Sequence, residues 1–181
     1  MKSNHLFLNP NPLVLGAGLI NSIVEILNDE QSTSIASLSI RDYLDGIRLN
    51  KNVENGLYFL YFPNDTYYVG IAASCTMIER LAKHLDGRKA GSFNSVLKNM
   101  GKDELTSNYY ESNQEFFSDA KVLFMPFNFA VIKVKPDFAL IQKIITKRLE
   151  EDFIYLMEQN GLTLRNKRKP KQLSQVFYYE D

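Results

Sequence analysis

The sequence contains no tryptophan, a single cysteine and only two histidines among its 181 residues. The single cysteine, Cys75, excludes an internal disulfide and is typical of a protein kept in a reducing compartment. No apolar run approaches the ~20 residues that a membrane-spanning helix needs, and the N-terminus lacks the apolar core of a signal peptide. We therefore expect a cytoplasmic protein with no membrane partner.

The chain also lacks an excess of charge of either sign, because 21 Lys and Arg residues balance 21 Asp and Glu residues. No global electric field therefore attracts it to nucleic acid, and any surface that binds nucleic acid has to be a local patch. Hydrophobic residues make up 45% of the chain and charged residues 23%, which are the proportions of an ordinary globular domain with a proper core.

The clearest structural pattern runs from Gly56 to Leu85. Residues 57–62 are apolar and aromatic, residues 63–65 are Pro-Asn-Asp, and residues 66–71 are again β-branched and aromatic. This order predicts two strands joined by a tight turn. Beyond it, the apolar residues recur at helical spacing, which predicts a helix with Arg80 and His84 one turn apart on one side.

The segments before this hairpin predict helices. Residues 1–13 contain the Asn-Pro pair twice and predict an extended arm, in which His5 is incidental. Residues 16–27 carry apolar side chains on one helical face. Ser39 is a suitable N-cap for a second short helix, whose apolar side would be Tyr43, Leu44 and Ile47. These helices form either a layer packed on the sheet or an accessory surface for target recognition or dimerisation.

The segments after the hairpin predict further strands and one long helix. Residues 122–125 and 130–135 have strand-like patterns, and residues 92–101 predict a short helix. Residues 102–119 are polar and give no assignment. The long helix spans residues 138–158, and its apolar stripe consists of Ile141, Ile145, Leu149 and Phe153.

These elements predict an α/β (α+β) fold, in which a small and mainly antiparallel sheet is flanked by helices. We expect residues 1–52 to form the arm and a helical N-terminal extension, residues 53–168 to form the core, and residues 169–181 to form a C-terminal tail.

Several motifs resemble those of GIY-YIG nucleases. Gly56-Leu57-Tyr58 and Tyr68-Val69-Gly70 stand where that family has its two tripeptides, and their tyrosines are ten residues apart. An arginine on the following helix, Arg80, matches the family arginine. The sequence LEEDFI at 149–154 and the later Asn166 extend the resemblance to most of the chain. The spacing from Gly70 to Arg80 is slightly longer than is common in the family, and the lysine often found after the second glycine is missing.

The resemblance implies a Mg²⁺-dependent DNA endonuclease, with Mn²⁺ as a substitute ion and without a nucleotide cofactor. It assigns Tyr58, Tyr68 and His84 to the attacking water. A tyrosine hydroxyl can accept a proton only if a neighbour helps to remove its own. Arg80 would bind the phosphate, because its planar guanidinium matches two phosphate oxygens.

The metal ligand would be Glu150 or Glu151, since one carboxylate with several waters suits Mg²⁺. Helical phase leaves both residues open, and the family pattern Leu-Glu-x-x-apolar-Ile favours Glu150. Asn166 matches the family asparagine, and Asn94 stands where the family often has a polar residue on its second helix.

Basic residues gather in two places and are the best candidates for contacts with the DNA backbone. They are Arg88 and Lys89 in one loop, and Arg165, Lys167, Arg168, Lys169 and Lys171 in the run RNKRKPK. A solvated tail is the alternative interpretation of that run.

The chain is most similar to small type II restriction endonucleases of the GIY-YIG family, which cut both strands of double-stranded DNA and would favour a homodimer. A structure-directed, repair or mobile-element nuclease of the same family is the first alternative. A catalytically silent module that binds nucleic acid is the second. A third interpretation, a chance match of the tripeptides, predicts that Tyr58, Tyr68, Arg80 and Glu150 do not come together in space.

Overall fold

The computed structural model describes residues 6–10, 14–50, 53–85, 116–126, 142–166 and 170–179. Several predictions fall outside these ranges: the helix at 92–101, the strand at 130–135, His5, and the candidate site residues Arg88, Lys89, Asn94, Lys167, Arg168 and Lys169.

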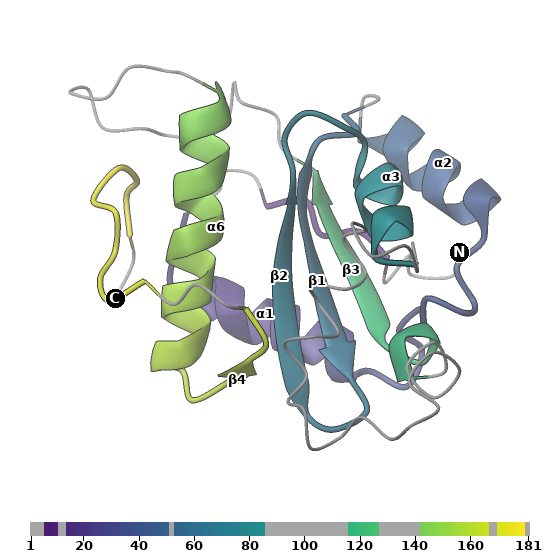
Figure 1. Ribbon diagram of the computed structural model, residues 1–181, viewed down its shortest axis with the longest axis horizontal. Helices are drawn as coiled ribbons and strands as arrows, with labels where there is room; N and C mark the ends of the chain where they lie inside the picture. The colour runs from purple at the N-terminus through teal and green to yellow at the C-terminus, as the bar shows by residue number, and fades with distance from the viewer. Residues whose placement is uncertain are drawn as a thin grey trace.

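The fold is α+β, with a four-stranded mixed sheet at its centre in the order β3-β1-β2-β4 (Figure 1). The strands are β1 (Gly56–Phe62), β2 (Thr66–Ala72), β3 (Lys121–Pro126) and β4 (Thr163–Leu164). β1 pairs antiparallel with both β2 and β3, whereas the short β4 runs parallel to β2. The predicted hairpin is therefore confirmed, and so is the strand predicted at residues 122–125.

The alternation of side chains along β1 divides the core into two layers. Leu57 and Phe59 point to one face and pack with α1 (Ala17–Asn28) and α6 (Gln142–Gln159). Tyr58, Leu60 and Phe62 point to the other face. Two helices pack there, α2 (Ile40–Leu49) and α3 (Met77–Ala82), and α3 continues into the 3₁₀ turn η1 (Lys83–Leu85). Helices thus cover both faces of the sheet (Figure 1).

Within the described residues, the helix predictions are confirmed with one correction, at Leu44. Ser39 caps α2 as expected, because its side chain accepts a hydrogen bond from the Asp42 backbone N–H at 3.0 Å. Leu44 is 49% exposed rather than packed. The buried side of α2 is formed by Tyr43, Gly46 and Ile47, since the Phe7 ring lies against Gly46, where a Cβ would come within 2.0 Å of it.

Both chain ends join the core. Residues 6–10, the described part of the N-terminal arm, pair with β3: the Leu8 N–H donates to the Phe124 carbonyl, and the Phe124 N–H donates to the Leu6 carbonyl, each at 2.9 Å. At the other end, Val176 and Phe177 are buried in the layer formed by α1 and α6. The predicted extension and tail therefore share the hydrophobic core of the central sheet. None of the described helices is both long and apolar enough to cross a membrane.

Candidate active site

Tyr58 and Gly70 face each other across the β1–β2 hairpin. A Cβ placed on Gly70 would lie 2.0 Å from Cζ of Tyr58 and 2.3 Å from its hydroxyl oxygen. The tyrosine ring therefore crosses over the neighbouring strand at a point where only a glycine leaves room. This contact gives a steric reason for pairing the tyrosine of the first tripeptide with the glycine of the second.

The side chain of His84 contacts the hydroxyl of Tyr58. The hydroxyl oxygen of Tyr58 is 2.5 Å from Nε2 of His84, and both side chains are buried, with exposed fractions of 0% and 1%. The His84 ring also makes an edge contact with the ring of Tyr68, with centroids 5.6 Å apart. Helix α3 and its 3₁₀ turn thus bring the histidine into the same cluster as the two tyrosines.

Both tyrosines keep their protons at neutral pH. Burial raises the pKa of Tyr58 well above its ordinary value, and the charge of Glu150 adds to the rise. Burial and the Glu150 charge also raise the pKa of Tyr68 to about 12, although Arg80 and a hydrogen bond with Tyr58 act in the opposite direction. Tyr68 is the more exposed of the two, so it is the phenol nearer to solvent.

Arg80 and Glu150 reach this cluster from different helices. The positive charge of Arg80, on α3, lowers the pKa of both tyrosines, and the negative charge of Glu150, on α6, raises both. Nε of Arg80 is buried and has no hydrogen-bond partner within the described parts of the chain. Arg80 and Glu150 therefore lie near enough to Tyr58 and Tyr68 to act on both of them electrostatically.

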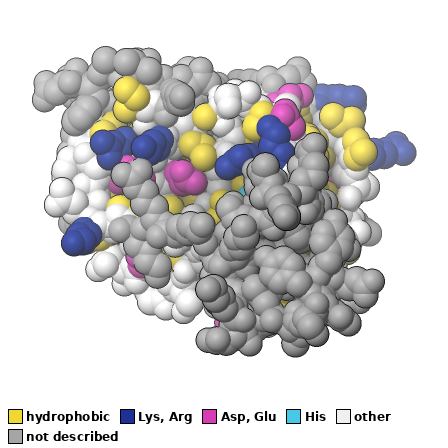
Figure 2. Space-filling model, viewed as in Figure 1, with side chains coloured by type: hydrophobic (Ala, Val, Ile, Leu, Met, Phe, Trp, Pro, Cys, Tyr) yellow, Lys and Arg dark blue, Asp and Glu magenta, His cyan; other side chains and the backbone are white. Residues whose placement is uncertain are grey.

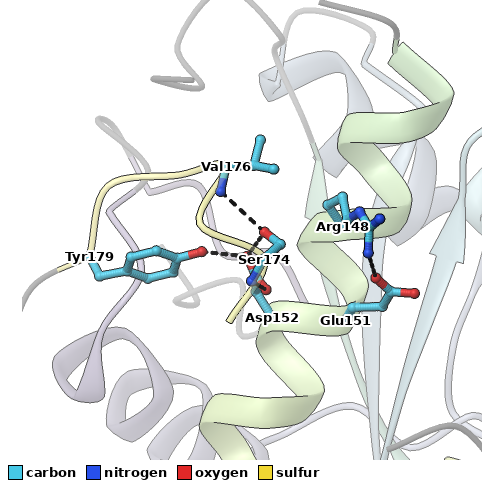
Figure 3. A network of polar contacts seen from close by, with 6 residues as sticks. All are labelled: Arg148, Glu151, Asp152, Ser174, Val176 and Tyr179. Atoms are coloured by element: carbon cyan, nitrogen blue, oxygen red, sulfur yellow. Dashed lines mark hydrogen bonds and ion pairs between the residues drawn. The ribbon is translucent and has the colours of Figure 1, made fainter. Parts of the chain in front are cut away.

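The two neighbouring glutamates have different surroundings. Oε2 of Glu151 forms an ion pair with Nη1 of Arg148 at 2.7 Å, on the side of α6 that faces residues 170–176 (Figure 3). Glu150 acts electrostatically on the two tyrosines instead. The tertiary structure thus distinguishes two residues that helical phase alone left equivalent.

A metal ion in this site would depend on Glu150 as a single protein carboxylate. Among the described residues, no group of three or more His, Cys, Asp or Glu side chains could hold a metal. Mg²⁺ accepts such a site, because it keeps several waters and binds substrate phosphates along with one or two carboxylates. The side chain of Glu150, half-buried beside two neutral phenols and one guanidinium, fits that ion.

Asn166 holds β4 onto β2. Its amide nitrogen donates to the Val69 carbonyl at 2.7 Å, and its amide oxygen accepts from the Val69 N–H at 3.0 Å. The side chain is buried, so both of its polar atoms are satisfied by the backbone of the strand that carries Tyr68. Asn166 therefore holds the backbone of Val69, the residue next to Tyr68, in place.

The structure corrects the prediction that Arg165 binds DNA, because this residue is buried. Its side chain is only 8% exposed, its Nε donates to Oγ1 of Thr66, and its guanidinium lies 5.5 Å from the Phe62 ring centroid and 5.4 Å from that of Phe116. An arginine enclosed in this way stabilises the fold and has little access to a phosphate backbone. Lys171, by contrast, is exposed.

The surface around the site carries mixed charge. Figure 2 shows Lys and Arg side chains close to Asp and Glu side chains across the upper part of this face, over α6 and α3. The described part of this face therefore has no broad patch of one sign, in keeping with the balanced composition.

One group of polar contacts was missed from the sequence. Asp152 is fully buried, although it belongs to the charged run LEEDFI. Its carboxylate accepts hydrogen bonds from the backbone and hydroxyl of Ser174 and from the hydroxyl of Tyr179 (Figure 3). The available signal was its helical phase, three residues after Leu149 of the apolar stripe.

Comparisons of the chain with protein-family models, with curated proteins and with solved structures find no match.

Proposed function

We propose that the protein is a Mg²⁺-dependent DNA endonuclease of the GIY-YIG kind, which hydrolyses phosphodiester bonds in double-stranded DNA. The observation that supports this proposal is the convergence of Tyr58, Tyr68, Arg80, His84 and Glu150 from two strands and two helices. Hydrolysis requires an activated water, compensation of the charge that develops on the phosphate, and stabilisation of the leaving oxygen.

In this proposal the tyrosines and the histidine form a proton path. Neither phenol can act as a preformed phenolate at neutral pH, because both pKa values are raised. The exposed side of Tyr68 would meet the attacking water and take its proton while its own proton passes to Tyr58. Tyr58 would in turn donate to Nε2 of His84, which lies 2.5 Å away. The path would end on Nε2 of His84, because a ring nitrogen of an imidazole can accept a proton.

Arg80 and Glu150 have complementary tasks at the phosphate. The partly exposed side chain of Arg80 would offer two parallel N–H donors of its guanidinium to two phosphate oxygens. Glu150 would hold the Mg²⁺ ion, which supplies positive charge to the phosphate and to the leaving oxygen. Asn166 would keep β2, and with it Tyr68, in register.

The test is cleavage of plasmid and phage DNA with Mg²⁺, comparing the wild type with Glu150→Gln, Arg80→Ala and Tyr68→Phe. We expect discrete fragments from the wild type and a loss of about 10²-fold or more in rate for each variant, because each removes charge stabilisation or proton transfer. Matched controls are Glu158→Gln on α6 and Lys83→Ala in the 3₁₀ turn η1, and both variants should cut like the wild type.

Two outcomes would contradict the proposal. Wild-type protein that shifts DNA on a gel but cuts none with Mg²⁺ or Mn²⁺ would be a silent binding module. Cleavage that survives Glu150→Gln would show that the active carboxylate lies elsewhere. Mapped fragment ends would separate a sequence-specific enzyme from a structure-directed one.

A further inference from the structure

A second polar site lies on the other side of α6 from the tyrosines. A cavity of about 500 Å³ is lined both by α6 and by the C-terminal residues 170–176. Arg148 and Glu151 line it from the helix, and Lys171, Gln172 and Gln175 line it from the C-terminal segment. Figure 1 shows the same arrangement, with α6 between the C-terminal segment and β2.

The C-terminal wall of this cavity is held in place by Asp152. Its carboxylate accepts from the Ser174 N–H at 2.7 Å, the Ser174 hydroxyl at 2.6 Å and the Tyr179 hydroxyl at 2.6 Å. The next residue, Gln175, has a left-handed backbone with φ of 63°, which costs energy for a residue other than glycine. The hydrogen bonds to Asp152 offset that cost, so the turn at the cavity has a fixed conformation.

The helical wall presents a fixed guanidinium. Nη1 of Arg148 donates to Oε2 of Glu151 at 2.7 Å, where the Glu151 side chain is only 10% exposed and the Arg148 side chain is 50% exposed. The nearly buried carboxylate therefore orients one edge of the guanidinium, and the exposed half carries the remaining N–H donors. A positioned guanidinium binds a phosphate with a smaller loss of side-chain entropy than a free one.

We propose that this cavity binds a phosphate of the DNA backbone, close to the phosphate that is cut at Glu150. Arg148 and Lys171 are its ligands, Glu151 positions Arg148, and Asp152 positions the turn that follows Lys171. Both carboxylates in the wall are occupied, because Asp152 accepts hydrogen bonds from Ser174 and Tyr179 and Glu151 forms an ion pair with Arg148. The assignment to DNA rests on the proposed nuclease function.

The helix gives the spacing between the two phosphates. Arg148 and Glu150 are two residues apart, so their side chains leave α6 in nearly opposite directions. A helix with its side chains is about 10–12 Å across, so the two phosphates would be separated by about that distance. α6 can thus lie against the duplex with one backbone phosphate on each side.

The experiment measures binding of a short DNA duplex by fluorescence anisotropy in EDTA, over a series of salt concentrations. We expect Lys171→Ala to weaken binding at least about threefold and to reduce the slope of log K against log[salt] by about one contact. Arg148→Gln combined with Glu151→Gln should do the same, and this pair leaves no unpaired buried charge. Lys147→Ala is the matched control, because Lys147 is an exposed lysine of α6 that does not line the cavity.

Wild-type affinity and an unchanged salt slope in both variants would overturn the inference. So would a thermal shift with inorganic phosphate that depends on Arg148 and Lys171 while DNA binding does not, since the cavity would then hold a free anion. Because binding is measured without metal, its outcome is separate from cleavage: loss of cutting in Glu150→Gln with wild-type affinity concerns only the proposed active site.

Discussion

At the residue scale, the contact between Gly70 and the Tyr58 ring restricts which residue can occupy position 70. The ring occupies the space of the missing Cβ, at 2.0 Å from where that atom would lie. We expect Gly70→Ala to lower the free energy of unfolding by about 1–3 kcal/mol, since the ring is fully buried and has no space to retreat into. Urea unfolding measures the change.

Gly18→Ala is the control for that substitution. Gly18 is an exposed residue of α1 with nothing within 4 Å of a Cβ, so alanine should leave stability unchanged or raise it slightly. Displacement of the Tyr58 ring should also weaken its contact with His84, and DNA cleavage should fall with stability in Gly70→Ala. An equal response of the two glycines would remove the steric argument.

The raised pKa of Tyr68 predicts a loss of stability at alkaline pH. The pKa is about 12 in the folded protein and about 10 in the unfolded chain, so between these values the unfolded chain binds fewer protons. The free energy of unfolding should therefore fall as pH rises from 10 to 12, by at most about 1.4 kcal/mol per pH unit for this residue. Tyr68→Phe should make the decline shallower. If urea titrations at pH 10, 11 and 12 gave the same decline for Tyr68→Phe as for the wild type, the surroundings of Tyr68 would not raise its pKa.

At the element scale, the site depends on a very short helix. α3 has six residues, too few to form a helix by itself, yet it carries Arg80 and leads into the turn with His84. Its N-terminus is capped by Thr76, whose hydroxyl oxygen accepts from the Glu79 N–H at 3.1 Å. The cap and the burial of Met77 and Leu81 are what hold this element in place.

We expect Thr76→Ala to lower the free energy of unfolding by about 1 kcal/mol and to reduce cleavage as well, because α3 would fray at the end that leads to Arg80. Thr76→Ser should retain both properties. Ser39→Ala removes the equivalent cap of α2, which carries no site residue, and should cost similar stability without loss of cleavage beyond it. Equal effects of the Thr76 and Ser39 variants on cleavage would show that α3 needs no cap to position Arg80.

At the scale of the whole molecule, the core is assembled from distant parts of the chain. The layer on one face takes Ile20, Ile23 and Leu27 from α1 and Val176 and Phe177 from the C-terminal segment. The layer on the other face takes Tyr43 and Ile47 from α2. Each of these side chains is fully or nearly fully buried, and burial of one large apolar side chain is worth about 1.5–3 kcal/mol.

The fragment 53–168, although it contains every motif of the proposed nuclease, should therefore not fold. The fragment loses seven such side chains, worth about 10–21 kcal/mol, which equals or exceeds the roughly 5–15 kcal/mol by which a domain is stable. Circular dichroism during heating should show no cooperative transition for the fragment and a clear one for the full chain. A cooperative transition in the fragment would mean that the core formed by residues 53–168 is stable without the N-terminal and C-terminal segments.

The sequence alone correctly predicted several of the local elements that the structure describes, because they follow from short-range patterns. The hairpin, the cap at Ser39, the stripe of the long helix and the sharing of one face by Tyr58, Leu60 and Phe62 depend on residues at most a few positions apart. The same patterns gave the α+β fold class. They also placed Arg80 and His84 on neighbouring turns, where the structure has α3 and its 3₁₀ extension.

Only the tertiary structure decided how these elements meet, since that depends on packing between residues far apart in the chain. It placed Glu150, and not Glu151, beside the tyrosines, although the two are adjacent in the sequence. It buried Arg165 beside the stacked rings of Phe62 and Phe116, where the sequence showed only a basic run. It buried Asp152 against Ser174 and Tyr179, more than twenty residues away, because a charge can leave water only where donors from elsewhere in the chain replace its hydration.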